Sequence, residues 1–436
     1  VLLAGRPVRA CLTPIRKVAG QSLVTVEGLA TGDQLHPLQQ AFIDHGAVQC
    51  GYCIPGVLMS AAALLDRTPN PNPDDVRQAL QGNLCRCTGY IKIIDAILAA
   101  ARTIRQNVRE PAPTNPAEAI GGHLRRHTAA GKVTGALRYA GDVKQTGMLY
   151  ACVLRSPHAH ARIDAINTAP GLALPGVRGI FTAADIPGVK TFYDNLDTIP
   201  PSELASWRGK TQEPLLAIDR VRMVGDPVAI IVADDEQTAR AGAARIDVHY
   251  TLLPPVFEPE QALQPTCPPL HATGNSYETQ QFAKDDFQAA VDQAEIFVET
   301  QISMPSQDHV TLEPEAMLAY PDSNGQLVVI GPTQQPHARQ EQIATMLNIP
   351  VEQVRVIAPE MGGSFGGRHH FWPVVAIALP AYLMQQPVKM VYSRREVFEA
   401  TVKRHPFRFK VNFGARPDGK VVGLRVTARG DAGPYG

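Results

Sequence analysis

Two short stretches decide the fold of the first part of the chain: "QCGYCIPG" at residues 49–56 and "NLCRCTGY" at residues 83–90. Each contains two cysteines, separated by two residues in the first stretch and by one in the second. The chain has only seven cysteines in 436 residues. Four of them in two tight pairs therefore indicate a shared role.

Apolar residues at helical spacing precede, separate and follow these stretches. In the third of the helical segments Asn72 can cap the helix and Pro73 suits its first turn. In the fourth, an isoleucine stripe of Ile91, Ile94, Ile97 and Ile104 predicts the buried face. Antiparallel helices would bring both cysteine turns to one end of a four-helix bundle. The predicted helical segments are residues 33–47, 56–66, 69–82 and 90–106.

Four thiolates from Cys50, Cys53, Cys85 and Cys87 could then converge on one small site. Zinc is one possible ligand, although zinc sites favour two or more residues between paired cysteines. Disulfides are a second possibility, and unliganded thiols a third; a reducing compartment disfavours disulfides. An iron–sulfur cluster tolerates the tighter pair, because two irons share the four ligands. The spacing favours the cluster and leaves the alternatives open.

Composition places the chain among ordinary globular proteins of more than one domain. Apolar residues make up 44% and charged residues 19%, and 41 basic residues balance 41 acidic ones. This balance gives no sign of a nucleic-acid or membrane-surface partner. No apolar run approaches the roughly 18 residues that span a bilayer. An odd number of unevenly spread cysteines is unlike a secreted disulfide framework, so we expect a cytoplasmic protein, with the periplasm as the alternative.

The rest of the chain predicts mixed α and β structure. A proline-rich linker over residues 109–127 leads into alternating strand-like and helix-like runs without a clean repeat. This mixture favours α+β architecture over one doubly wound sheet. Residues 1–31 are strand-like, and both ends of the sequence have the character of an internal fragment.

A second informative stretch is "APEMGGSFGGRHH", residues 358–370, which follows a strand and precedes an apolar helix. Its four glycines allow a tight turn and close backbone approach to a ligand. A plain glycine-rich turn is one interpretation. A dinucleotide loop is another, but the spacing is G-G-x-x-G-G rather than G-x-G-x-x-G, and the next strand ends in arginines. Alone, this loop would be weak evidence for any function.

The cysteine stretches, with their spacing and flanking helices, resemble the helical iron–sulfur domain of the xanthine oxidase and aldehyde oxidoreductase family of molybdenum hydroxylases. "MGGSFGG" resembles the loop that approaches the molybdenum centre in that family. The resemblance implies an α+β multidomain fold with a four-helix 2Fe–2S bundle, an α/β hammerhead and a partial molybdopterin-binding domain. The implied limits are a ferredoxin-like β remnant at 1–31, the bundle at 32–108, the hammerhead at 128–255 and the partial molybdopterin domain at 256–436.

The resemblance also assigns residues. Cys50, Cys53, Cys85 and Cys87 match the ligands of one complete 2Fe–2S cluster, and Cys11 matches the fourth ligand of another, whose remaining ligands would precede Val1. Gln49 and Cys87 match positions against the pterin. The implied molybdenum-site residues are Gln307, Gly363, Phe365 and Gly366, with Arg404 as a substrate-binding arginine. Histidines 158 and 160 are expected to be structural, and Cys152 and Cys267 to be ordinary thiols.

The implied reaction is hydroxylation of an aldehyde or N-heterocycle, with oxygen from water and electrons leaving through the clusters. No flavin domain separates the two halves, so the electron acceptor could be a flavin subunit; a homodimer is a further expectation. His369 stands where purine-oxidising members carry a glutamate, which weakens a xanthine assignment, although Arg404 points the other way. Because the family's catalytic glutamate lies far downstream, we expect residues 1–436 alone to be inactive. The alternatives are a truncated, non-catalytic electron carrier and a zinc-stapled binding protein.

Overall fold

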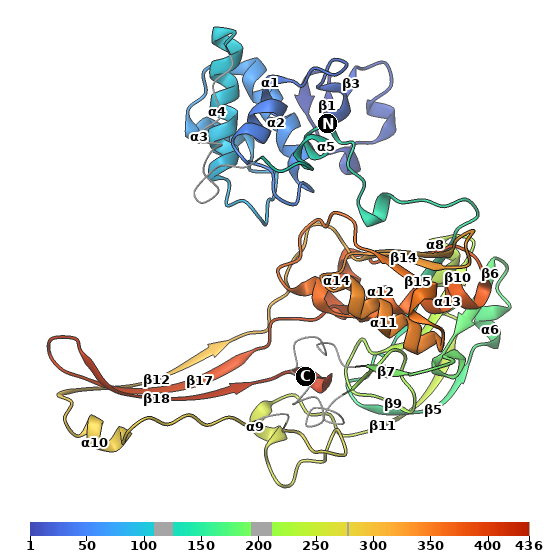
Figure 1. Ribbon diagram of the computed structural model, residues 1–436, viewed down its shortest axis with the longest axis vertical. Coiled ribbons are helices and arrows are strands. Elements are labelled where there is room, and N and C mark those ends of the chain that lie inside the picture. Colours follow the sequence, from blue (N-terminus) through green and yellow to red (C-terminus); the bar gives the residue numbers. More distant parts are fainter. Residues whose placement is uncertain (109–124, 193–211, 277–278, 436) are drawn as a thin grey trace. The chain divides into compact units, whose positions relative to one another are not determined.

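The computed structural model describes residues 1–108, 125–192, 212–276 and 279–435 (Figure 1). Most of the predicted linker at 109–127 lies outside these residues. The chain forms two compact units, and each is described separately. The first unit comprises residues 1–142, 310–313 and 359–365, and the second comprises 143–309, 314–358 and 366–436. None of the helices within the described ranges is long and apolar enough to cross a membrane.

The first unit begins with a small antiparallel sheet of β1 (Leu2–Leu3), β2 (Arg6–Pro7) and β3 (Leu23–Val24). Ala4 and Gly5 form the β1–β2 turn with φ values of 47° and 74°, as a tight hairpin requires. The 3₁₀ turns between and after these strands are η1 (Ala10–Leu12), η2 (Ile15–Lys17) and η3 (Val26–Gly28).

All four predicted helices are present in the first unit: α1 (Pro37–Asp44), α2 (Ile54–Arg67), α3 (Pro73–Ala79) and α4 (Ile91–Gln106). Asn72 caps α3 as expected, since its side chain accepts hydrogen bonds from the N–H groups of Asp74 and Asp75. Phe42, Ile54 and Leu58 are fully buried between the helices. Burial of this kind, at about 25 cal/mol per Å² of apolar surface, is the main force that holds the bundle.

The predicted isoleucine stripe of α4 is wrong at its ends. Ile91 is 71% exposed and Ile104 is 45% exposed, whereas Ile93 and Ile97 are fully buried. The buried face combines isoleucines with Ala96 and other alanines, because small residues let α4 approach α1 closely. Ile91 lies six residues before Ile97, which is about 120° around the helix axis from it.

A fifth short helix, α5 (Ala129–Thr134), packs against α1 and α2. Ala129 and Val133 belong to the hydrophobic core of the first unit. The sequence had placed residues from 128 onward with the hammerhead, whereas these residues pack with the helices because their apolar face is buried there. The compact first unit therefore runs on to Asp142, after η4 (Ala140–Asp142).

The second unit is built on a seven-stranded mixed sheet, as expected for α+β architecture. Two strand pairs, β14–β15 and β4–β16, are parallel, and the others are antiparallel. In order, the strands are β15 (Val354–Ile357), β14 (Leu327–Ile330), β13 (Ala316–Pro321), β16 (Val388–Val391), β4 (Leu149–Arg155), β10 (Pro227–Ala233) and β6 (Val177–Phe181).

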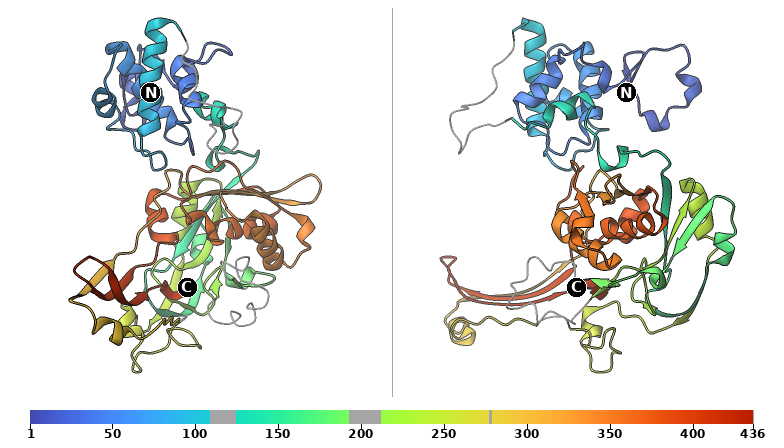
Figure 2. Two further views of the ribbon diagram at one scale, coloured as in Figure 1. Left: turned by 60° about the vertical axis from the view of Figure 1, so that its left-hand side comes forward. Right: turned by 45° about the vertical axis from the view of Figure 1, so that its right-hand side comes forward.

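Helices cover this sheet (Figures 1 and 2). The helices α11 (Pro336–Leu347), α12 (Trp372–Ala376) and α13 (Ala378–Met384) pack against the β13–β14–β15 part. The helix α8 (Glu236–Ala243) packs against β4 and β10. Every residue of β10 is buried, which explains its uninterrupted apolar sequence.

Three smaller sheets complete the second unit. They are β11 (Asp247–Leu252), β5 (Ala161–Asn167) and β9 (Arg220–Val221); β12 (Ile296–Met304), β17 (Phe407–Ala415) and β18 (Val421–Gly430); and β7 (Thr191–Phe192) with β8 (Glu213–Pro214). The sheet β12–β17–β18 forms a long ribbon (Figure 1). The short elements are α6 (Ala169–Leu172), η5 (Ala183–Asp185), α9 (Pro259–Ala262), α10 (Phe287–Val291), η7 (Val351–Gln353), η8 (Gly367–His369), α14 (Arg394–Ala400) and η9 (Gly433–Tyr435).

Candidate cofactor sites

The four clustered cysteines interact as two pairs within the first unit. Cys53 is the N-cap of α2, Cys50 lies in the turn before it, and Cys85 and Cys87 lie between α3 and α4. The thiol of Cys53 hydrogen-bonds to Cys85, and that of Cys50 to Cys87. The bundle therefore brings together the four residues that the sequence proposed as ligands.

One thiol of each pair has a lowered pKa. The hydrogen bond from Cys53 lowers the pKa of Cys85 to about 5, and the bond from Cys50 lowers the pKa of Cys87 to about 7. The same bonds, together with burial, raise the pKa values of the donors Cys53 and Cys50. Deprotonated thiols are the form that binds metal.

This pairing fits a two-iron cluster better than a single ion. Each iron of a 2Fe–2S cluster takes two cysteine ligands, and the structure offers two pairs. A structural zinc ion needs ligands that converge as one tetrahedral group. The donor set therefore fits the cluster.

The turn that carries Cys85 and Cys87 is held by residues just after it. The N–H of Cys85 donates to the Tyr90 hydroxyl at 2.7 Å, and that hydroxyl donates to the Asn83 carbonyl at 2.8 Å. The Thr88 hydroxyl lies 3.1 Å from the Cys85 sulfur. The turn of Cys85 and Cys87 is thus held by Thr88 and Tyr90, which directly follow it in the sequence.

The other cysteine turn is held by α5 and the residues after it. Lys132 Nζ donates to the Gln49 carbonyl at 2.9 Å. The Tyr139 hydroxyl donates to the Cys50 carbonyl at 2.8 Å, and its ring lies 5.1 Å from the ring of Tyr52. Sequence reasoning missed Lys132 and Tyr139. The available signal was a lysine on the same helix face as two apolar residues of α5.

The first part of the glycine loop, residues 359–365, also belongs to the first unit. Gly362 N–H donates to the Glu313 carboxylate at 2.7 Å. A Cβ added at Gly362 would lie 2.8 Å from the Tyr52 ring. Gly363 has a φ of 106°, a conformation that side chains rarely adopt. The loop is therefore glycine-rich because it runs close to its neighbours and bends sharply.

Phe365 has a φ of 55° and a ring that is 47% exposed. The guanidinium of Arg86, which lies between Cys85 and Cys87, sits 5.9 Å from the centre of that ring. This cation–π contact joins the cysteine turn to the glycine loop. The loop continues into the second unit at Gly366, which has a φ of 95° and caps η8.

Gln307 and Arg404 come together in the second unit. Gln307 N–H donates to the Arg404 carbonyl at 3.2 Å, and Arg404 N–H donates to the Gln307 carbonyl at 2.9 Å. This antiparallel bridge lies just beyond the paired ends of β12 and β17. Both residues are exposed, and Arg404 also donates from Nη2 to the Pro305 carbonyl at 3.1 Å. The structure thus joins two predicted site residues that are far apart in sequence.

The residues given ordinary roles occupy ordinary places. His160 is buried with Nδ1 2.8 Å from the Pro254 carbonyl, and His158 packs edge-on against Tyr250. Cys152 is buried in an apolar cluster, and burial raises its pKa to about 12. Cys11, by contrast, was expected to be a ligand of a further cluster, and it is exposed in η1.

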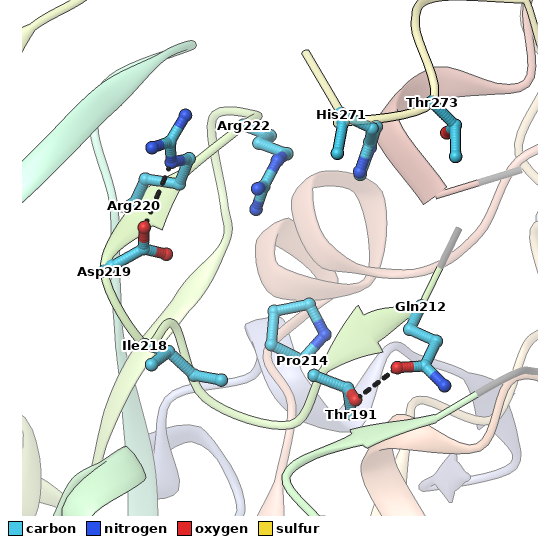
Figure 3. Close-up of a pocket in the computed structure, with 10 residues that line it drawn as sticks. Thr191, Gln212, Pro214, Ile218, Asp219, Arg220, Arg222, His271 and Thr273 are labelled. Carbon is cyan, nitrogen blue, oxygen red and sulfur yellow. Dashed lines mark hydrogen bonds and ion pairs between the residues drawn. The ribbon is translucent and has the colours of Figure 1, made fainter. Parts of the chain in front are cut away.

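The second unit also contains a cavity of about 270 Å³ (Figure 3). Arg220, Arg222 and His271 border it, and Thr191 donates a hydrogen bond to Gln212 at 2.6 Å across another edge. Arg220 is paired with Asp219, and Arg222 donates from Nε to the Leu270 carbonyl. None of the residues that line it is a site residue predicted from the sequence.

Three sequence families match successive parts of the chain. A 2Fe–2S binding domain matches residues 25–98, the a/b hammerhead domain of aldehyde oxidase and xanthine dehydrogenase matches residues 134–254, and a molybdopterin cofactor-binding domain matches residues 270–436. The hammerhead match begins after most of α5.

Relatives agree with these matches. The aldehyde oxidoreductase of Megalodesulfovibrio gigas is 32% identical over all of this chain and 49% of its own length. The nicotinate dehydrogenase large molybdopterin subunit of Eubacterium barkeri is 33% identical over 70% of this chain and 68% of its own length. The solved aldehyde oxidoreductase from Desulfovibrio gigas superposes with a TM-score of 0.90 at 31% identity, over 99% of this chain and 48% of that one.

The chain therefore belongs to the aldehyde oxidase and xanthine dehydrogenase family of molybdenum hydroxylases, whose cofactors are a 2Fe–2S cluster and molybdopterin. It has the mixed α and β multidomain fold of the solved aldehyde oxidoreductases. It spans about half the length of the first relatives that it matches.

Proposed function

We propose that the protein containing this chain hydroxylates an aldehyde or an N-heterocycle, with water as the oxygen source, and passes the electrons out through 2Fe–2S clusters. The observation that carries the proposal is the pairing of Cys50 with Cys87 and of Cys53 with Cys85 in the unit that also holds residues 359–365 of the glycine loop. A proposed electron-transfer site and the first part of the glycine loop then lie in one compact unit.

Different residues of the chain have different proposed roles in binding the cofactors. The four cysteines hold the cluster, while Gln49 and Cys87 face the pterin. The glycine loop offers backbone N–H groups where no side chain intervenes, at Gly363 and Gly366. When bound, the molybdenum cofactor supplies the two-electron oxidation of the substrate carbon.

The remaining assigned residues bind substrate. The exposed ring of Phe365 provides an apolar face for a flat or small organic substrate. Gln307 positions a polar group by hydrogen bonding, and Arg404, exposed beside it, binds an anionic or carbonyl part of the substrate. In this proposal Cys11 serves a further cluster together with residues outside the chain.

The names of relatives guide the choice of substrate. They include an aldehyde oxidoreductase, a nicotinate dehydrogenase subunit and a quinoline 2-oxidoreductase. Aldehydes and N-heterocycles are accordingly the first substrates to test, with His369 arguing against xanthine. A separate flavin subunit is the proposed electron acceptor, and a homodimer the proposed assembly. Residues 1–436 by themselves are expected not to turn over.

Metal analysis of the purified protein, with visible and EPR spectra, tests the proposal. We expect iron with acid-labile sulfide, a reducible 2Fe–2S signal and molybdenum. We also expect turnover of aldehydes or N-heterocycles with an artificial electron acceptor in the protein at its natural length. Iron without molybdenum would instead favour a non-catalytic electron carrier. Zinc without iron would refute the hydroxylase and favour a zinc-stapled binding protein.

A further inference from the structure

Lys132 is a buried cation beside the cysteine ligands. Its side chain has no exposed surface, and its ammonium group donates to the Gln49 carbonyl at 2.9 Å and to the Glu360 carboxylate at 2.8 Å. Glu360 comes from the glycine loop, 228 residues later in the sequence. A single ammonium group therefore bridges the first cysteine turn and the loop.

Burying an ammonium group costs several kcal/mol, and a buried ion pair is weak evidence for stability alone. The carboxylate of Glu360 also pairs with a second cation besides Lys132. Glu360 is 23% exposed and forms a second ion pair with Arg126 at 3.2 Å. Burial would raise the pKa of Glu360, but the hydrogen bond from Lys132 and the two positive charges lower it. Two cations share one anion here, so positive charge remains beside the cysteine turn.

The stem of Lys132 also lies directly on the turn. A Cβ added at Gly51 would lie 2.6 Å from Lys132 Cδ and 2.9 Å from the Tyr139 hydroxyl. Gly51 has a φ of 88°, a conformation that residues with side chains rarely adopt. The residue directly after Cys50 is thus glycine partly because Lys132 occupies the space.

We propose that Lys132 is a positioning residue that raises the reduction potential of the 2Fe–2S cluster held by Cys50, Cys53, Cys85 and Cys87, and that Glu360 moderates this effect from the glycine loop. The proposal rests on the proposed function for the presence of the cluster. Reduction adds one electron and one negative charge, with no bond made or broken. A fixed buried cation stabilises that added charge, because the surrounding dielectric is low.

Opposite shifts in two variants test this role. Reduction of the cluster is followed by EPR in a redox titration of the purified protein. We expect Lys132→Met to lower the equilibrium constant for one-electron reduction about tenfold, a fall of 59 mV in the midpoint potential. We expect Glu360→Gln to raise the potential, because it leaves the lysine charge less compensated. Lys132→Arg keeps the charge, so its midpoint potential should remain near that of the wild type.

A matched control is Lys92→Met, which removes an exposed lysine in the first turn of α4. Solvent screens that charge, so the potential should not move. If Lys132→Met fails to assemble the cluster, Glu360→Gln still tests the sign. A normal cluster signal with an unmoved potential, or with both variants shifted in the same direction, would overturn the proposal. A wild-type protein without any 2Fe–2S signal would instead refute the proposed function, and this proposal with it.

Discussion

The two cysteine turns and the glycine loop share one compact unit but are built in different ways. The cysteine site consists of four side chains at fixed spacing. The second cysteine turn is held by local contacts such as the hydrogen bond from Cys85 N–H to the Tyr90 hydroxyl, and the first turn by Lys132 and Tyr139. The glycine loop consists of positions where side chains are missing, as at Gly362 and Gly363. The residue types and spacing of side-chain ligands indicate their function in the sequence. A loop that contributes backbone groups carries no such signal. Three substitutions test this contrast.

The largest effect is expected at the cysteine site. Cys85→Ser removes one ligand of four and leaves Cys53 without its thiol partner. We expect the cluster to be lost, with the iron content and visible absorbance falling to background. Cys267→Ser is the control, because Cys267 is half-buried in the second unit and outside the site. Normal iron binding in Cys85→Ser would show that the four thiols do not act together.

An intermediate effect is expected at Gly51, where the first cysteine turn has no room for a side chain. Gly51→Ala combines the strain of a positive φ with a clash against Lys132. Gly89→Ala carries comparable φ strain, at 63°, but its Cβ would meet no atom within 4 Å. We expect Gly89→Ala to cost about 1–2 kcal/mol and Gly51→Ala clearly more, measured by thermal unfolding followed at the cluster absorbance. Equal losses of stability in the two variants would mean that the Lys132 side chain moves aside at little cost.

The smallest effect is expected in the glycine loop. Gly363→Ala, at a φ of 106° and 3.1 Å from the Phe365 ring, should introduce strain of about 1–3 kcal/mol. The molybdenum-to-iron ratio should fall while the 2Fe–2S signal stays intact. The control is Gly325→Ala, which has a φ of 81° and no neighbour within 4 Å. A loss of iron together with molybdenum would show that the loop and the cysteine turns are not separable.

Local patterns predicted much of the fold. The four bundle helices and the Asn72 cap follow from short-range periodicity and turn chemistry. The ribbon strands β12 and β17 were not foreseen. β12 carries no clear apolar alternation and is little buried. β17 does alternate apolar and polar residues from Phe407 to Phe413, so its pattern was available in the sequence and was missed.

Contacts between distant segments could not be predicted. The spacing of the cysteines indicated the cluster site, but nothing near Lys132 in the sequence points to Glu360. Likewise, resemblance identified Gln307 and Arg404 separately, while the backbone bridge between them joins residues almost a hundred positions apart. Only the folded chain shows which residues support the ligands.

The late arrival of Glu360 has a consequence for the order in which the protein is made. Lys132 leaves the ribosome 228 residues before its counterion, which is roughly 10–45 s at 5–20 residues per second. Throughout that interval its ammonium group has no carboxylate from the glycine loop, so we expect the cysteine turns to stay open to solvent. Limited proteolysis of ribosome-bound chains that end before residue 360, and of chains long enough for Glu360 to have left the exit tunnel, would reveal this delay. The contact between the first cysteine turn and the glycine loop therefore forms late in synthesis.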